Sequence, residues 1–232
     1  MNERRNDRIF HASKPILLAG AGRADSAFLA HHAGDKNLVA VDGGLAHLLQ
    51  AGLVAEMLIG DMDSVTPQAR REAAAGGCRI VEISDQNSTD LEKALAHCRA
   101  PWFAGFGFLD GRFDHALAAL NVLVKFQASH LVLLVGAEDV MTVVSGPLHL
   151  QLPVGSRLSV CPILPLSFVR SEGLEWSLDG LRLEIGGQGG SSNRCSAASQ
   201  MIEPESPDQP FVLITERGHL SSLAGWLSSA RP

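Results

Sequence analysis

Short apolar segments alternate with helix-like segments between residues 15 and 135, and this alternation restricts the fold more than any other feature of the sequence. Each apolar segment is nearly continuous, which favours a strand buried on both faces. Between these segments, apolar residues recur at helical spacing, as Leu117, Leu120 and Leu123 do. The alternation predicts an α/β domain with a mostly parallel sheet covered by helices. The predicted strands are 15–19, 37–41, 56–59, 79–83, 102–106 and 131–135.

The segments between these strands carry helix signals of their own. The segment 67–75 is rich in Ala, Arg and Glu, and Gly76-Gly77 ends it. Thr89 and Glu92 have the spacing of a capping box, in which the Thr hydroxyl accepts a hydrogen bond from the backbone three residues later. They predict the start of another helix. The predicted helices are 24–32, 45–51, 67–75, 89–99 and 113–127.

The character of the sequence changes after about residue 137. Short apolar stretches are now separated by Gly, Pro and Ser, and 181–185 alternates apolar with charged residues as a half-exposed strand does. This pattern predicts an all-β sandwich or barrel, so we expect one domain at 1–136 and a second at 137–232. The predicted elements of the second domain are strands at 140–144, 148–152, 157–161, 168–169, 174–178, 181–185 and 211–215, a loop at 186–192, an exposed turn at 202–210 and a short helix at 220–227.

The composition excludes several classes of protein. Of the 232 residues, 46% are apolar, and the net charge is −6. An acidic chain is a poor candidate for nucleic-acid binding, which depends on Lys and Arg against phosphate. No apolar run reaches the ~18 residues of a membrane span, and the charged N-terminus lacks the apolar segment of a secretory signal. We expect a cytoplasmic protein with free thiols, because the cysteines are widely spaced, at Cys78, Cys98, Cys161 and Cys195.

Acidic residues follow four of the six predicted strands. In a parallel sheet, ligands bind beyond the carboxyl ends of the strands. Carboxylates gathered at that edge repel one another unless a cation lies between them, and hard oxygen ligands suit Mg²⁺. The alternative is ordinary solvation of each loop. The acidic loops begin at Asp42, Asp61, Asp85 and Asp110.

Gly60-Asp61-Met62-Asp63-Ser64 is the most informative of these loops. If the backbone stays extended across Met62, the carboxylates of Asp61 and Asp63 point to the same side and form a cation site. The alternative is that these Asp residues cap the following helix.

The glycine signals for a nucleotide are weak. Gly20-Ala21-Gly22 lacks the third glycine of a dinucleotide-binding fingerprint, and the chain has no Walker loop. A nucleotide would therefore be held by Mg²⁺, helix N-termini and a few cations. Arg112 is the best candidate, and its alternative is an exposed side chain paired with Asp110 or Asp114. Lys93 lies one turn into a predicted helix and could also reach phosphate, but such a lysine is more often solvated, and we expect it to be solvated.

With these loops in order, the sequence resembles the thiamine pyrophosphokinase family over roughly residues 16–194. Each motif is short, and their shared order makes the resemblance specific. Two positions depart from the family pattern: Met62 stands where Phe is usual, and Asn87 stands where an acidic residue is common. The motifs are Asp42-Gly43-Gly44, Gly60-Asp61-Met62-Asp63-Ser64, Asp85-Gln86-Asn87-Ser88-Thr89-Asp90, Gly111-Arg112-Phe113-Asp114-His115, Gly173-Leu174-Glu175-Trp176-Ser177-Leu178 and Ser192-Asn193.

The resemblance implies an N-terminal α/β domain, a C-terminal β-sandwich and a homodimer in which thiamine binds where domains and subunits meet. It also implies the reaction. The pyrophosphoryl group of ATP passes to the hydroxyl of thiamine, and the products are thiamine diphosphate and AMP.

The resemblance further implies roles for residues of the first domain. Mg²⁺ would be held against the phosphates by Asp61, Asp63 and Asp90, while Asp42 or Asp114 would orient the thiamine hydroxyl or take its proton. Arg112 would stabilise charge on the transferring group. The residues expected to contact the nucleotide are Asp61, Gln86, Thr89 and Arg112.

In the second domain, the resemblance implies a thiamine site. Trp176 offers a flat face to the cationic, aromatic thiamine, and its alternative is a core position. Ser192 and Asn193 would hydrogen-bond the aminopyrimidine, and their alternative is a turn.

Two other classes of function use the same acidic edge. A Mg²⁺-dependent phosphohydrolase would use water as the acceptor and need no aromatic site in the β-rich half. A non-catalytic nucleotide-sensing module would tolerate loss of those carboxylates that contact neither base nor ribose.

Overall fold

A computed structural model describes residues 10–229, so the charged segment 1–9, with the expectation about a secretory signal, lies outside the described residues. The chain divides into two compact units, with the boundary between Ala137 and Glu138, and each unit is described by itself. Among the described residues, no helix is long and apolar enough to cross a membrane. All four cysteines are free thiols, as expected.

The first unit contains a six-stranded parallel sheet whose strands match the predicted ones to within a residue or two. In chain order they are β2 (Ile16–Ala19), β3 (Asn37–Val41), β4 (Met57–Gly60), β5 (Arg79–Glu82), β7 (Phe103–Phe106) and β8 (Val132–Val135). Their order across the sheet is β8-β7-β2-β3-β4-β5. Every residue of β2, β4, β7 and β8 is buried, because helices cover both faces of the sheet.

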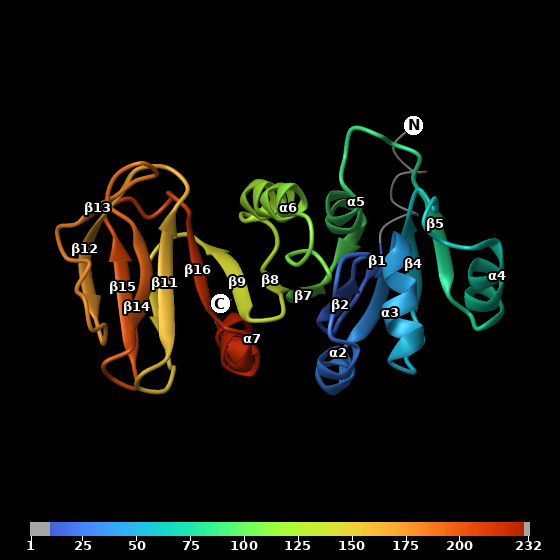
Figure 1. The fold of residues 1–232 in the computed structure, drawn as a ribbon, viewed down its shortest axis with the longest axis horizontal. Helices are drawn as coiled ribbons and strands as arrows, with labels where there is room; N and C mark the ends of the chain where they lie inside the picture. The colour runs from blue at the N-terminus through green and yellow to red at the C-terminus, as the bar shows by residue number, and fades with distance from the viewer. Residues whose placement is uncertain (1–9, 230–232) are drawn as a thin grey trace. The chain divides into compact units, whose positions relative to one another are not determined.

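The helices of this unit also lie where the sequence predicts them. They are α2 (Ser26–Ala33), α3 (Leu45–Gln50), α4 (Pro67–Ala75), α5 (Asp90–His97) and α6 (Phe113–Phe126). The chain steps outward from β2 to β5 and then returns to β7 and β8 on the other side of β2. Because βαβ connections are right-handed, this reversal puts α5 and α6 on the face opposite α2 and α3, as Figure 1 shows. A short parallel pair that the sequence does not reveal joins β1 (Phe10–His11) to β6 (Cys98–Arg99).

The reversal creates a switch point between β2 and β7, where ligands bind in open α/β sheets. The loops after these two strands lie against each other, since the amide of Gly22 donates to the carbonyl of Gly107 at 3.0 Å. Beside them, β3 runs into a 3-10 turn, η1 (Asp42–Gly44). Gly44 packs so tightly that a Cβ there would lie 1.7 Å from the carbonyl oxygen of Ala19. Only glycine allows this approach, and it fixes Asp42 at the switch point.

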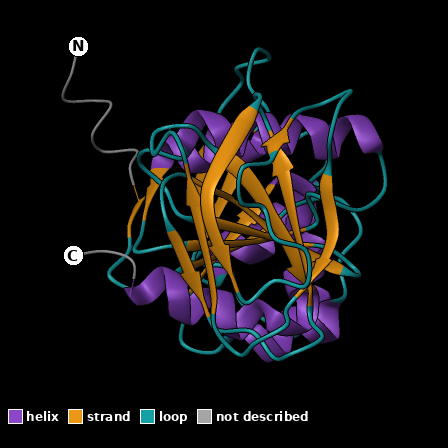
Figure 2. Cartoon of the chain, turned by 90° about the vertical axis from the view of Figure 1, so that its left-hand side faces the viewer, coloured by secondary structure: helices purple, strands orange, loops and turns teal. Residues whose placement is uncertain are grey.

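The second unit consists mainly of antiparallel strands (Figure 2). One sheet has the order β14-β11-β16-β9 and the other has the order β10-β15-β12-β13. Phe168 and Phe211, one from each sheet, meet edge to face with ring centroids 5.9 Å apart, so the two sheets share a core. The strands are β9 (Asp139–Val144), β10 (Leu148–Leu150), β11 (Arg157–Pro162), β12 (Leu166–Glu172), β13 (Arg182–Leu183), β14 (Gly190–Arg194), β15 (Gln200–Pro204) and β16 (Phe211–Glu216), followed by α7 (Leu220–Ser229).

Several predictions for the second unit were wrong. The segment 174–178 is a loop, because Gly173 and Gly180 turn the chain with φ of 71° and 68°. The expected strand 181–185 shrinks to β13, and the expected loop 186–192 ends in β14. The expected exposed turn at 202–210 begins inside β15, where Ile202 is fully buried. Polar and proline-rich composition concealed β14 and β15, whose pairing partners are distant in sequence.

Candidate active site

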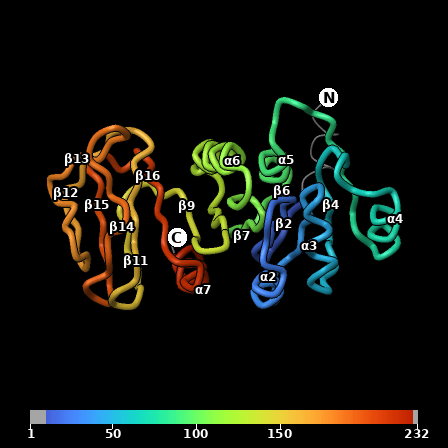
Figure 3. The backbone as a smooth tube through the Cα atoms, in the orientation of Figure 1, coloured from blue at the N-terminus to red at the C-terminus, as the bar shows by residue number. Residues whose placement is uncertain are grey.

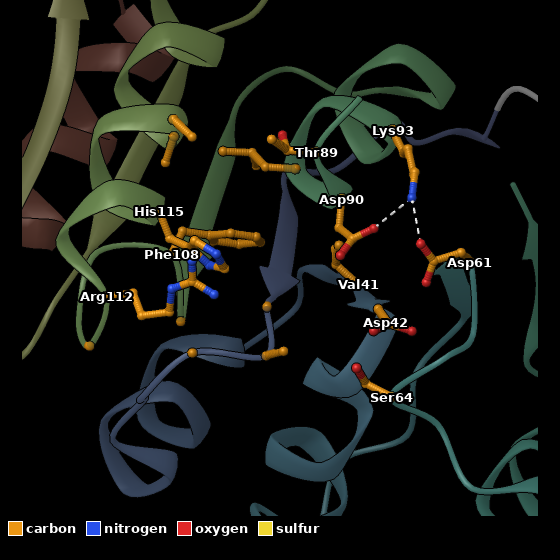
Figure 4. Close-up of a pocket in the computed structure, with 18 of the residues that line it drawn as sticks. Val41, Asp42, Asp61, Ser64, Thr89, Asp90, Lys93, Phe108, Arg112 and His115 are labelled. Carbon is orange, nitrogen blue, oxygen red and sulfur yellow. Dashed lines mark hydrogen bonds and ion pairs between the residues drawn. The ribbon is translucent and has the colours of Figure 1, made fainter. Parts of the chain in front are cut away.

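A cavity of about 660 Å³ opens at the switch point of the parallel sheet. It lies beyond the carboxyl ends of the strands, and α5 and α6 contribute to its wall (Figure 4). Four of the five carboxylates predicted to be catalytic line it, as do the residues predicted to contact the nucleotide. These residues are Asp42, Asp61, Asp63, Asp90, Gln86, Thr89 and Arg112.

Asp42 is a buried carboxylate with an unpaired oxygen. Only 3% of the residue is exposed, and its Oδ1 has no hydrogen-bond partner among the described residues. Burial raises the pKa of the Asp42 carboxyl, and hydrogen bonds from Ser64 and the Gly43 amide offset this only in part. The backbone of Asp42 is left-handed, with φ of 47°, a conformation that non-glycine residues adopt rarely and often at functional sites. An unpaired buried carboxylate oxygen of this kind is a natural cation ligand.

Asp61 and Asp63 follow β4, the neighbour of β3 in the sheet. The expectation of an extended backbone between them was wrong, because Met62 is left-handed, with φ of 68°, and its side chain is buried. The resulting turn lets the Asp63 amide donate to Asp61 Oδ1 at 3.4 Å. One oxygen each from Asp42, Asp61 and Asp63 lies within 4.8 Å of the others. Three hard oxygen ligands at this spacing suit a divalent cation such as Mg²⁺.

Lys93 is the site residue that sequence reasoning missed. Instead of being solvated, its side chain is 3% exposed, and its ammonium donates to Asp61 Oδ2 at 3.1 Å and to Asp90 Oδ1 at 3.0 Å (Figure 4). Burial alone would lower the pKa of Lys93, but the hydrogen bonds to Asp90 and Asp61 outweigh it and raise the pKa. The largest influence on Asp61 is this hydrogen bond, which lowers the pKa of its carboxyl. A signal for this role was present in the sequence, because Asp90 and Lys93 are three residues apart and therefore lie on one face of the predicted helix.

Asp90 begins α5 and faces Lys93, so it lies outside the cluster of Asp42, Asp61 and Asp63. Its role as a metal ligand stays a prediction. Thr89 caps the helix as expected, because its Oγ1 accepts from the amide of Glu92 at 3.3 Å.

The loop between β5 and α5, traced in Figure 3, carries Gln86 to the cavity. Asp85 organises this loop by accepting from the amide of Asn87 at 3.0 Å and from the hydroxyl of Ser88 at 2.7 Å. These hydrogen bonds lower the pKa of the Asp85 carboxyl. Asp85 is therefore occupied in holding the loop, which leaves Gln86 and Thr89 to face the cavity.

Arg112 and Asp114 form an exposed ion pair, the alternative that the sequence left open for Arg112. The guanidinium donates through Nε at 3.1 Å and through Nη2 at 2.6 Å, and its side chain is 69% exposed. This pairing lowers the pKa of the Asp114 carboxyl. Arg112 lies beside Phe108 and His115, across the cavity from the acidic residues (Figure 4). A phosphate role for Arg112 stays a prediction.

The second unit brings together the three residues predicted to bind thiamine. Trp176 is 54% exposed, which excludes the core alternative. Asn193 is buried, and its side chain is engaged at both ends by the backbone of Trp176, accepting from the amide at 3.2 Å and donating to the carbonyl at 2.6 Å. Ser192 is left-handed, with φ of 60°, and its amide donates to Ser159 Oγ at 2.9 Å. Asn193 therefore holds the loop that displays Trp176.

Known proteins resemble this chain in sequence. The family model for the catalytic domain of thiamin pyrophosphokinase matches residues 31–135. Thiamin pyrophosphokinase 1 of Caenorhabditis elegans is 28% identical over 189 residues, which cover 74% of this chain and 76% of that protein. Thiamine pyrophosphokinase of Bacillus subtilis is 37% identical over 92 residues, covering 38% of this chain and 42% of that protein.

Solved structures of the same name share the fold. The crystal structure of thiamine pyrophosphokinase from Bacillus subtilis aligns with a TM-score of 0.74 at 20% identity, covering 88% of this chain and 99% of that one. Thiamin pyrophosphokinase from Candida albicans aligns with a TM-score of 0.77 at 15% identity, covering 90% of this chain and 92% of that one.

The unpaired oxygen of Asp42 leads to a prediction about stability. Without divalent cations, Asp42→Asn should raise the free energy of unfolding by about 1 kcal/mol, because it removes an uncompensated buried charge beside Asp61 and Asp63. For a chain of this length, that raises the melting temperature by roughly 2–4 °C. Adding Mg²⁺ should stabilise the wild type and have less effect on the variant. A variant that melts lower than wild type without Mg²⁺, yet gains as much from the cation, would contradict a metal role for Asp42.

Proposed function

We propose that the chain is a thiamine pyrophosphokinase, which transfers the pyrophosphoryl group of ATP to the hydroxyl of thiamine, giving thiamine diphosphate and AMP. The observation that carries this proposal is the convergence of Asp42, Asp61 and Asp63 in a cavity at the switch point. A cavity of about 660 Å³ is within the range of ligand pockets.

The carboxylate cluster fits Mg²⁺. Asp42 contributes a buried oxygen that otherwise lacks a partner, and Asp61 and Asp63 contribute the next two ligands. Asp90 also remains a proposed ligand, through the oxygen that Lys93 does not hold. Bound there, Mg²⁺ would offset the charge of the phosphates and of the transferring group.

The chain itself supplies the remaining contacts to the phosphates. The N-terminus of α5 lines the cavity together with Thr89 and Gln86, and we propose that its backbone amides and these polar side chains contact the phosphates. Within residues 10–229, the Arg112 side chain is held by an exposed ion pair with Asp114, which costs little to exchange for a phosphate. In that position its guanidinium would stabilise the charge that develops on the transferring group.

The thiamine hydroxyl must be oriented and must lose its proton. Of the two carboxylates considered for this step, Asp42 has the raised pKa and Asp114 the lowered one. Because a cation bound at Asp42 would lower the pKa of this carboxyl, both Asp42 and Asp114 stay proposed for orienting the hydroxyl or taking its proton.

For thiamine itself, we propose a site on the second unit, whose two antiparallel sheets would form a sandwich. Trp176 exposes a ring suited to stacking on a cation, Ser192 lies on the neighbouring strand, and Asn193 acts by fixing the Trp176 loop. We further propose that the protein is a cytoplasmic homodimer that binds neither nucleic acid nor membrane.

The products of the reaction test the proposal most simply. Purified protein with ATP, Mg²⁺ and thiamine should release AMP in step with thiamine diphosphate, and AMP release should stop when thiamine is omitted. Chromatography of the nucleotides gives both quantities. ADP as the main product would contradict pyrophosphoryl transfer, and nucleotide hydrolysis that is independent of thiamine would favour a phosphohydrolase.

Trp176→Ala tests the thiamine site. Losing ~1.4 kcal/mol of stacking should raise the KM for thiamine about tenfold, while the KM for ATP stays near wild type. The exposed ring should contribute little to stability, so the melting temperature should change little. Trp176→Phe should recover much of the loss because a π face remains. An unchanged KM for thiamine in the folded Ala variant would remove Trp176 from the site.

A further inference from the structure

Lys93 is a buried ammonium at the acidic edge, and the roles assigned above give it no task. It lies one turn after Asp90 on α5, the helix that packs on β3 and β4, the two strands that deliver Asp42 and Asp61. The helix thereby brings a fixed positive charge to the place where the carboxylates converge. Long charged side chains are almost never this deeply buried without partners, and Lys93 has two.

The ion pair between Lys93 and Asp61 engages only one of the two carboxylate oxygens of Asp61. Its Oδ2 accepts from Lys93 at 3.1 Å, and its Oδ1 faces the turn that carries Asp63, whose amide donates to it at 3.4 Å. Asp61 is thus shared between the ammonium and the cluster of Asp42 and Asp63. A divalent cation bound by the cluster would interact with the same carboxylate as Lys93, so the cation and Lys93 would each weaken the binding of the other to Asp61.

We propose that Lys93 is a resident counter-ion that acts through Asp61 and Asp90 to lower the affinity of the carboxylate cluster for a free divalent cation. The proposal rests on the proposed function, in which the cation works together with ATP. A cluster weakened in this way binds the metal when the triphosphate supplies further oxygens and negative charge, and releases it with the products. Mg²⁺ favours such shared sites, in which one or two carboxylates act together with phosphates and water.

The charge of Lys93 also stabilises the edge itself. Without it, neither the cluster of Asp42, Asp61 and Asp63 nor the neighbouring Asp90 would have an ion pair with a positive side chain among the described residues. A variant that lacks the charge should therefore depend on a divalent cation for its stability. If Lys93 served only to tie α5 to the loop after β4, its replacement would lower the stability of the protein by the same amount with or without metal.

The test uses the full chain and Mn²⁺, which takes the same oxygen ligands as Mg²⁺. Free Mn²⁺ is measured by electron paramagnetic resonance in the absence of nucleotide. Lys93→Met and Lys93→Gln should each bind Mn²⁺ at least tenfold more tightly than wild type, which corresponds to ~1.4 kcal/mol. Both should melt below wild type without metal and gain more from Mn²⁺ than wild type does.

The chain offers a matched control in Lys125 of α6. This lysine forms an ion pair with Glu92, which lies on α5 as Lys93 does but does not line the cavity. Lys125→Met removes an equal charge and should leave Mn²⁺ affinity unchanged. Lys93→Gln separates charge from orientation, because its amide can still donate to the carboxylates, and it keeps the test valid if Lys93→Met does not fold. Unchanged or weaker Mn²⁺ binding by Lys93→Gln would overturn the proposal, and equal tightening in Lys125→Met would overturn it as well. Pyrophosphoryl transfer is measured separately by AMP release, so the proposed function can stand if the counter-ion role fails.

Discussion

Repulsion among carboxylates at one edge of the parallel sheet is the constraint on which the architecture of the first unit depends. Asp42, Asp61 and Asp63 bring one oxygen each to within 4.8 Å of the others, and the first of them is buried with an unpaired oxygen. Such an arrangement is unfavourable without a cation. The left-handed backbones of Asp42 and Met62 add local strain, which the buried sheet below them must offset. Structure of this kind persists where it serves binding or catalysis.

The sheet makes this edge possible because it joins strands that are distant in sequence. β3 and β4 are neighbours, so the turns that follow them meet, and α5 packs over both strands and adds Asp90 and Lys93. The reversal of strand order at β2 and β7 opens the cavity beside the cluster and puts Arg112 on its far side. The proposed metal ligands, counter-ion and phosphate-binding groups thus come from several βα connections of one sheet.

The strands and helices of the first unit could be predicted from sequence because each is a buried apolar run or an amphipathic helix with its own end signals. The acidic edge could also be predicted, because parallel strands bring their carboxyl ends, and the acidic loops that follow them, to one edge of the sheet. Lys93 was not predicted, because its burial depends on Asp61, which lies on another element. The turn at Met62 was not predicted, because a non-glycine residue rarely adopts a positive φ. In the second unit, β15 was missed because its pairing with β10 and β12, and not its composition, makes it a strand.

We propose that the carboxylate edge holds a divalent cation against the phosphates of a nucleotide. The most direct measurement is an anomalous difference map from crystals that contain Mn²⁺ and a non-hydrolysable ATP analogue. We expect one or more peaks bonded to oxygens of Asp42, Asp61 and Asp63 at about 2.1 Å, the distance typical of small hard cations, and each peak should also be bonded to a phosphate oxygen. A bound nucleotide whose phosphates and metal lie away from these three carboxylates would exclude them as the metal site.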